Sequence, residues 1–168
     1  RGQGARAIGY YQRALEICRA MGNSMLMTVV SLNLGDLYKE QGQSEKGMEI
    51  MRRAIDGVRA AHNLSLLAMA IRGLACAYLE LGGVETAEGL FLEALELRRS
   101  CDQTREEVAL LACLGRCCLE RGEPERARAW LDEARKLASE RGQKEPELAQ
   151  ALVELELAQG RIEEARAG

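Results

Sequence analysis

Aromatic residues, prolines and histidines are scarce in this 168-residue chain. Aromatic residues make up 4% of it, and it contains two prolines and one histidine. The β-branched residues are also few, whereas Ala, Leu, Glu, Arg and Gly dominate. This composition argues against a β-sheet protein and favours helices. A hydrophobic content of 47% argues against intrinsic disorder, so we expect one folded all-α domain or one continuous helical array.

An excess of positive charge and a long hydrophobic run are missing as well. The formal net charge is −3, from 23 basic and 26 acidic residues, so no basic field points to nucleic acid or to an anionic membrane. The most hydrophobic stretch, 64–79, contains Arg72 and is too short to cross a bilayer. Residues 1–20 mix charged, polar and apolar residues, unlike a secretory signal. We therefore predict no nucleic-acid partner and no membrane partner.

The six cysteines are not spaced like a disulfide framework. They lie at positions 18, 76, 101, 113, 117 and 118, and three of them crowd into one or two helical turns. Reduced thiols in a cytoplasmic protein are the simpler interpretation. No Cys-x-x-Cys pair is present, and the one histidine, His62, is distant from the three crowded cysteines. We predict no metal site and expect the cysteines to act as small buried apolar side chains.

Recognisable catalytic motifs are missing too. The glycines follow a repeat period, described below, and do not form a phosphate-binding loop. His62 is expected at a turn, which makes it a poor general base, and the many glutamates are expected on exposed helix faces. We predict that the chain is not an enzyme and needs no cofactor.

What the chain does contain is an internal repeat of forty residues. Small and apolar residues recur at this interval: Gly2, Gly42, Gly82 and Gly122; Ala14, Ala54, Ala94 and Ala134; and Leu34, Leu74 and Leu114. The last copy is shorter, since Gly160 follows Gly122 after 38 residues. A fixed period of this length is typical of solenoids, in which each unit packs on its neighbours.

Each unit is expected to form two antiparallel helices. The first, roughly 25–41, 65–81 and 105–121, is apolar on most sides and should be buried on more than one face. The second carries apolar residues at i, i+3, i+4 and i+7, with small residues at 47, 87 and 127 and at 54, 94 and 134 that allow close approach. Gly42, Gly82, Gly122 and Gly160 are predicted to end the first helices. Ser44 is a candidate N-cap, and Pro124 suits a first helical turn.

These positions resemble the tetratricopeptide consensus. Leu34-Gly35-Asp36-Leu37-Tyr38, followed by Gly42, Gly47, Met51 and Ala54, matches the pattern Leu-Gly-x-x-Tyr, Gly, Ala, a large apolar residue and Ala. The second copy keeps Tyr78, and the third has Cys118 in the place of the tyrosine. The resemblance covers nearly the whole chain and implies an all-α, right-handed α-solenoid of antiparallel helical hairpins. The matching positions are packing positions, so they say little about function.

The forty-residue unit is six residues longer than the usual one. Units of that length are similar to those of kinesin light chains, Pins-type spindle-orientation adaptors and the sensor arms of bacterial regulators such as the maltose-regulon activator. We expect one array over 1–168: a half repeat at 1–23, full repeats at 24–63, 64–103 and 104–143, and a truncated repeat at 144–168. Neither end resembles a polar capping helix, so we expect the chain to be a fragment of a longer protein.

In this family the first helices line a concave groove where ligands commonly bind. The resemblance implies groove-facing candidates on three successive first helices: Asn33, Asp36, Lys39, Glu40, Met69, Arg72, Cys76, Glu80, Ala112, Arg116 and Glu120. The clamp that some members use for a C-terminal carboxylate is absent, since Asp36, Cys76 and Arg116 stand where it needs Asn or Lys. Glu40, Glu80 and Glu120 recur at one level. They could form an acidic rail for a basic peptide, or be surface glutamates offset by Lys39, Arg121 or cations of the next repeat.

Three functions remain open. The first is a protein- or peptide-binding module that uses the groove and has no catalytic role. The second is a sensory segment of a bacterial signalling or transcription regulator that binds a small effector or peptide. The third is a structural role, with self-association through exposed solenoid ends. We predict a protein or peptide partner, with a basic peptide as one option.

Overall fold

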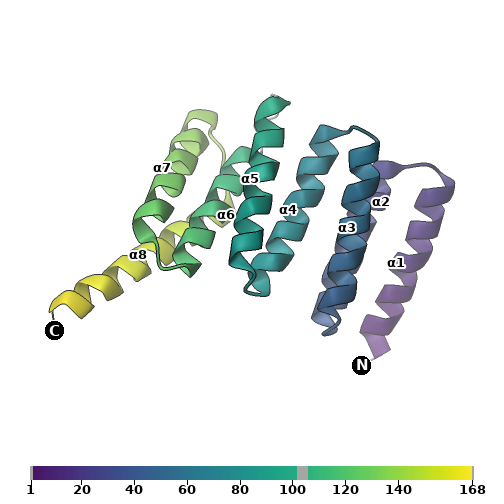
Figure 1. The fold of residues 1–168 in the computed structure, drawn as a ribbon, viewed down its shortest axis with the longest axis horizontal. Helices are drawn as coiled ribbons and strands as arrows, with labels where there is room; N and C mark the ends of the chain where they lie inside the picture. Colours follow the sequence, from purple (N-terminus) through teal and green to yellow (C-terminus); the bar gives the residue numbers. More distant parts are fainter. Residues whose placement is uncertain (1, 102–105, 168) are drawn as a thin grey trace.

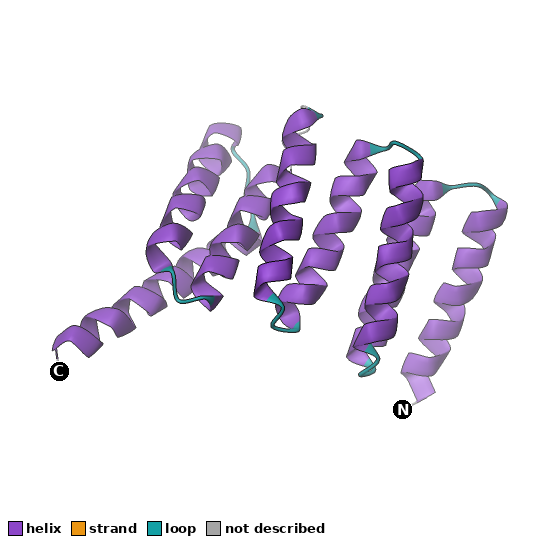
Figure 2. Cartoon of the chain, viewed as in Figure 1, coloured by secondary structure: helices purple, strands orange, loops and turns teal. Residues whose placement is uncertain are grey.

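The chain folds into α-helices joined by short turns. The computed structural model describes residues 2–101 and 106–167, in which eight helices and no strand are found (Figure 2). The helices are α1 (Gly2–Ala20), α2 (Ser24–Glu40), α3 (Ser44–Ala60), α4 (Leu64–Glu80), α5 (Val84–Ser100), α6 (Glu107–Glu120), α7 (Pro124–Arg141) and α8 (Pro146–Ala167). None of the described helices is long and apolar enough to cross a membrane.

The helices stand side by side along one direction, as in a solenoid (Figure 1). Helices α2 and α3, α4 and α5, and α6 and α7 pair as antiparallel hairpins, with α1 packed on α2 at one end of the array. First helices also touch one another, α2 on α4 and α6 on α8, which explains why they are apolar on more than one side. The all-α solenoid of helical hairpins expected from the repeat is therefore confirmed.

Tight turns end the first helices where the glycine period predicts them. Gly42, Gly82 and Gly122 have φ angles of 74°, 78° and 71°, a left-handed conformation that costs a residue without Cβ little. Of the described turns after second helices, those after α1 and α7 use Gly22 and Gly142 in the same conformation, whereas the turn after α3 uses His62, with φ of 53°. His62 is thus a turn residue, as expected. Its Cβ makes the left-handed conformation less favourable than it would be for glycine.

Two of the predicted helix ends differ from the structure. Ser44 is the first residue of α3, and Gln43 before it is the N-cap, without a side-chain hydrogen bond. The side chains that do cap are Asn23 and Asn63, which accept hydrogen bonds of 3.0 Å from the backbone N–H groups of Leu26 and Leu66.

The prediction that Gly160 ends a helix is wrong. Helix α8 continues through it to Ala167. A single glycine inside a helix costs only about 1 kcal/mol, so it ends a helix only where the next segment turns away. Pro124, in contrast, lies in the first turn of α7 as expected.

The core runs through the array between the two helices of each hairpin. Its largest fully buried side chains include Met51, Ile71, Phe91, Leu114 and Leu131. The small residues of the second helices let the hairpins close: Ala87, Ala94, Ala127 and Ala134 are fully buried. In the first full hairpin the two helices approach so closely that a Cβ on Gly47 would lie 2.4 Å from the carbonyl oxygen of Gly35.

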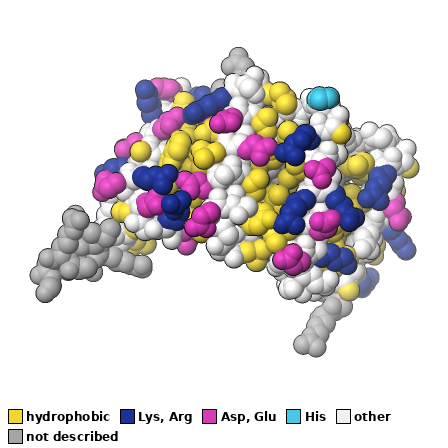
Figure 3. Space-filling model, in the orientation of Figure 1, with side chains coloured by type: hydrophobic (Ala, Val, Ile, Leu, Met, Phe, Trp, Pro, Cys, Tyr) yellow, Lys and Arg dark blue, Asp and Glu magenta, His cyan; other side chains and the backbone are white. Residues whose placement is uncertain are grey.

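Ion pairs between successive second helices repeat with the period. Arg59 on α3 pairs with Glu93 on α5 at 3.0 Å, and forty residues later Arg99 on α5 pairs with Glu133 on α7 at 2.6 Å. Basic and acidic side chains accordingly alternate over the face shown in Figure 3 and do not separate into two fields. This agrees with the near-neutral composition.

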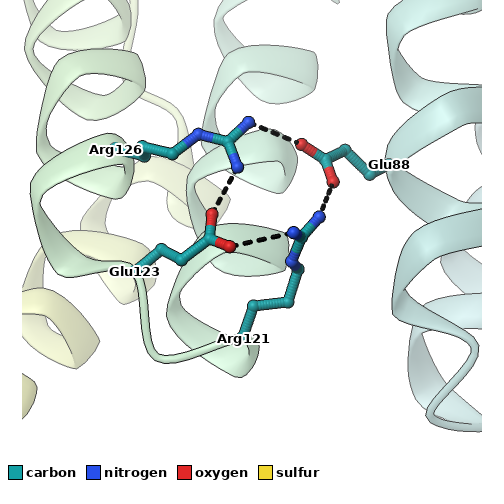
Figure 4. A network of polar contacts seen from close by, with 4 residues as sticks. All are labelled: Glu88, Arg121, Glu123 and Arg126. Atoms are coloured by element: carbon teal, nitrogen blue, oxygen red, sulfur yellow. Dashed lines mark hydrogen bonds and ion pairs between the residues drawn. The ribbon is translucent and has the colours of Figure 1, made fainter.

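A closed ring of four charges joins α5 to the turn between α6 and α7 (Figure 4). Glu88 accepts from Arg121 at 2.7 Å and from Arg126 at 3.2 Å, and both arginines also contact Glu123. The Glu88 side chain is only 13% exposed, so its charge is partly desolvated and compensated by both cations. This ring fixes the third hairpin on the second.

Candidate functional site

The described surface contains a pocket between the first helices α4, α6 and α8. It measures about 480 Å³ and is lined by Arg72, Cys76, Leu79, Glu80, Gly82, Cys113, Arg116, Glu120 and Glu147. A second hollow of about 290 Å³ adjoins it, shares Arg72 and Glu147, and adds Glu106, Ala109, Gln143 and Glu145. We call these two hollows together the groove. Five sequence-predicted residues meet in it: Arg72, Cys76, Glu80, Arg116 and Glu120.

The two arginines supply the positive charge of the groove. The Nε atom of Arg72 is buried and has no hydrogen-bond partner among the described residues. The Nε atom of Arg116 is also buried, and its nearest carboxylate oxygen belongs to Glu154 at 3.3 Å, in an ion pair without hydrogen-bond geometry. A buried donor without an acceptor is costly, so this part of the groove favours an anionic or carbonyl group.

Two thiols lie beside the arginines. The side chains of Cys76 on α4 and Cys113 on α6 line the same pocket and influence each other's ionisation; Cys76 is half-buried and Cys113 is buried. The hydrogen bond from Cys113 lowers the pKa of Cys76 against the opposing effect of burial, and Arg72 and Arg116 add to the lowering. The same hydrogen bond and burial raise the pKa of Cys113.

Two carboxyl groups of the α7–α8 connection also interact in the groove. Burial and the hydrogen bond with Glu147 raise the pKa of Glu145. The hydrogen bond from Glu145 lowers the pKa of Glu147, and the charge of Arg72 lowers both. The pair therefore holds a proton more readily than two separate carboxylates would, and Arg72 stabilises the charge that remains.

The expected acidic rail is interrupted. Glu80 accepts a hydrogen bond from Lys39 on α2, which also contacts Asp36 at 3.1 Å. Burial alone lowers the pKa of Lys39, but the hydrogen bonds to Glu80 and Asp36 outweigh it and raise the pKa. Glu80 is thus offset by the lysine that the sequence offered as an alternative, whereas Glu120 has no ion pair within the described residues and faces the pocket.

The remaining candidates are not gathered in the groove. Asn33, Asp36 and Glu40 are exposed on α2, and Met69 is partly buried against the core. Ala112 is fully buried, so the expectation that it faces a ligand is not met. Helix α6 contacts α5, α7 and α8, so little of its surface is left open.

Sequence reasoning missed the contribution of α8 and the proximity of the thiols. Glu147 lies in the region where the forty-residue register slips, so no repeat position marked it. The proximity of the thiols does follow from the repeat once one pair of first helices is known. Gly73 on α4 packs against Leu32 on α2, because a Cβ at Gly73 would lie 2.9 Å from the Leu32 side chain. Forty residues later, Cys113 takes the place of Gly73 and Arg72 takes the place of Leu32. The register therefore places residue 113 against α4 near Arg72.

The other residues of chemical interest are the possible metal ligands and the cysteines outside the groove. Among the residues that the structure describes, no group of three or more His, Cys, Asp or Glu side chains could hold a metal ion. Cys117 and Cys118 are fully buried in the core, which fits their predicted role as small apolar side chains. Burial raises the pKa of Cys117 to about 12.

Comparison with known families decides the relationship of this chain. Residues 1–167 match the model of the MalT-like TPR region, where TPR stands for tetratricopeptide repeat. The chain belongs to this family. A search of curated proteins gave no match.

Solved structures show the same fold. BtubC (BKLC) from P. vanneervenii superposes with a TM-score of 0.77 at 24% identity, over 99% of this chain and 70% of that one. A Podosopora anserina protein classed with the kinesin light chains gives a TM-score of 0.72 at 18% identity, over 99% and 83%.

A signal-transduction ATPase with a TPR sensor, PH0952 from Pyrococcus horikoshii, gives 0.74 at 21% identity, over 94% of this chain and 24% of that one. The resemblance of the MalT-like TPR chain to kinesin-light-chain-type repeats and to a regulator sensor is thereby confirmed for the fold.

Proposed function

We propose that this MalT-like TPR chain is a non-catalytic binding module, and that its groove receives a peptide segment of a partner protein. The observation that supports this most directly is the buried, unpartnered Nε of Arg72 in a pocket of about 480 Å³. That volume lies within the range of about 300–1,000 Å³ typical of ligand sites. TPR regions generally serve as interaction or sensor modules, and the family match covers residues 1–167.

The charges of the groove favour a segment that carries both signs. Arg72 and Arg116 suit a carboxylate, which could form charge-assisted hydrogen bonds with the guanidinium groups. Glu120 lines the same pocket and suits a basic side chain next to that carboxylate. A purely basic peptide would meet both arginines, and a purely acidic one would meet Glu120 and Glu147. An acidic residue flanked by a basic one matches the groove best.

Binding to a peptide array tests this proposal. The chain should prefer short peptides with adjacent acidic and basic residues, and Arg72→Met should weaken binding by at least about tenfold, since a charge-assisted hydrogen bond contributes about 1.5–3 kcal/mol. Arg53→Met is the matched control, because the Arg53 side chain is 77% exposed on α3, outside the groove. Equal binding by wild type and Arg72→Met would contradict the proposal.

The acidic side of the groove has its own test. Because Glu80 is already paired with Lys39, Glu120 is the sharper probe. Glu120→Lys should weaken the peptides selected on the array and spare variants of them that lack the basic residue. If Glu120→Lys together with Glu80→Lys leaves binding unchanged, the partner's basic residue does not bind this rim.

A sensory role is the second candidate. It is favoured by the match to the MalT-like TPR region and by the likeness to a signal-transduction ATPase with a TPR sensor. In that case the groove should also bind a small anionic effector. A thermal-shift screen with small carboxylates and phosphates, repeated on Arg72→Met, separates the two: stabilisation that disappears in the variant supports the sensor, and peptide binding without any small-molecule effect supports the interaction module.

A further inference from the structure

The two thiols of the groove stand apart from the other cysteines. Cys113 is 3% exposed, and it lines the same pocket as Cys76, which is half-buried. The remaining four are buried in the core or lie at the end of α5, where Cys101 is 3.8 Å from the Ser100 hydroxyl. Only this pair, among the described cysteines, combines a thiol that solvent can reach with a second thiol that lines the same pocket.

The surroundings of the pair differ on its two sides. Arg72 is one turn before Cys76 on α4, and Arg116 approaches from α6, so two guanidinium groups favour a negative sulfur at Cys76. Glu80 opposes them from one turn after Cys76, but its own charge is compensated by Lys39. Cys113 lies deeper, where burial disfavours a thiolate. The exposed sulfur is therefore the nucleophile, and the buried one keeps its proton.

We propose that Cys76 and Cys113 are a redox-active pair: hydrogen peroxide oxidises Cys76, and Cys113 then closes a disulfide that links α4 to α6. In the first step the Cys76 thiolate attacks one peroxide oxygen, the O–O bond breaks, and Cys76 becomes a sulfenic acid as hydroxide leaves. In the second step the Cys113 sulfur attacks the Cys76 sulfur, the S–O bond breaks, and the proton of Cys113 leaves with the hydroxyl as water. A dithiol such as dithiothreitol reverses the second step by thiol–disulfide exchange.

The step has a structural consequence for the array. The two sulfurs are not bonded in this structure and must approach to a bond of about 2.05 Å. Because the pair joins the first helices of successive repeats, the disulfide would fix the angle between the second and third hairpins on the groove side. It would also remove the nucleophilic sulfur from the pocket. The proposal does not depend on the partner of the groove.

Tryptic mapping of the full chain gives a direct test, because cleavage after Arg72, Arg98, Arg105 and Arg116 places Cys76 and Cys113 in separate peptides that contain no other cysteine. Cys76 falls in peptide 73–98 and Cys113 in 106–116, whereas the other cysteines fall in 14–19, 100–105 and 117–121. After brief treatment with dilute hydrogen peroxide, we expect peptides 73–98 and 106–116 to appear cross-linked, with a mass lower by two hydrogen atoms. The link should disappear with dithiothreitol and should not form in urea.

Variants assign the two roles. Cys113→Ala should stop the reaction at a Cys76 sulfenic acid that dimedone traps, and Cys76→Ser should leave peptide 106–116 unoxidised. Cys101→Ser is the matched control and should leave the cross-link unchanged. The wild-type experiment needs no variant to fold, so it decides alone: the proposal is overturned if Cys101 is oxidised while Cys76 and Cys113 remain thiols, or if the cross-link forms equally well in urea.

Discussion

Replacing Gly47 with alanine should destabilise the first full hairpin, because α2 and α3 leave no room for a methyl group there. A Cβ on Gly47 would lie 2.4 Å from the Gly35 carbonyl oxygen and 3.4 Å from the Tyr38 Cβ. The first of these atoms is backbone and cannot rotate away. Non-bonded heavy atoms prefer about 3.5 Å, so the two helices would have to separate by roughly 1 Å.

The expected magnitude combines two opposing effects. Overpacking a tight contact costs about 1–3 kcal/mol, whereas replacing glycine by alanine inside a helix returns about 1 kcal/mol. Gly57 in the same helix supplies the matched control, because a Cβ there meets no atom within 4 Å. Gly57→Ala keeps the gain without the contact. The difference in unfolding free energy between the two variants should therefore be about 1–3 kcal/mol.

Urea and thermal unfolding followed by far-ultraviolet circular dichroism measure this difference. The expected order of stability is Gly57→Ala, then wild type, then Gly47→Ala. Gly35→Ala is a useful third variant: its Cβ would meet the flexible end of Met51 at 2.6 Å before the Gly47 carbonyl at 3.0 Å, so its cost should be smaller. If Gly47→Ala and Gly57→Ala are equally stabilised, α2 and α3 leave room for a methyl group at Gly47, and the prediction is refuted.

Three further predictions concern stability. His62→Gly should stabilise the chain by about 1 kcal/mol, because His62 occupies a left-handed conformation; urea midpoints measure this. Glu107→Ala should cost about 3 kcal/mol, because this buried carboxylate holds Arg99 and Arg141. Stability should fall as pH rises from 9.0 toward 12, because burial raises the pKa of Cys117 from 9.0 to about 12 and only the unfolded chain ionises there.

Each of these has a control. The exposed Glu93 forms a comparable pair with Arg59, so Glu93→Ala should cost less than about 1 kcal/mol, and equal losses for Glu93 and Glu107 would contradict the role of burial. Cys117→Ala should flatten the alkaline loss, and an unchanged slope would assign it to other groups. If His62→Gly is less stable than wild type, the imidazole makes a contact whose stabilisation exceeds the cost of the left-handed backbone.

The local features of the fold could be read from the chain. Gly42, Gly82 and Gly122 end first helices as predicted, because a left-handed turn strongly selects a residue without Cβ. Pro124 begins a helix because its fixed φ suits a first turn. The prediction that Gly160 ends a helix was wrong, because glycine allows the chain to turn but does not force it to, and α8 continues past Gly160.

The groove could be read only in part. Arg72, Cys76 and Arg116, which the repeat register places on successive first helices, line the same pocket, and their role in binding stays a prediction. Glu147 was not predicted, since the register slips after residue 143 and α8 begins at a proline instead of a repeat position. Ala112 was expected to face a ligand, but it is fully buried on α6, which contacts α5, α7 and α8.

By itself, then, the sequence determined the helices, their pairing and the solenoid, because a forty-residue period of apolar and small residues can bury its surface only against copies of itself. The tertiary structure decided which polar groups find partners and which do not. Lys39 reaches Glu80 across forty residues, Cys113 reaches Cys76, and the Nε of Arg72 has no partner among the described residues. Such contacts depend on rotamers and on sub-ångström packing between repeats, which the spacing of residues along the chain does not specify.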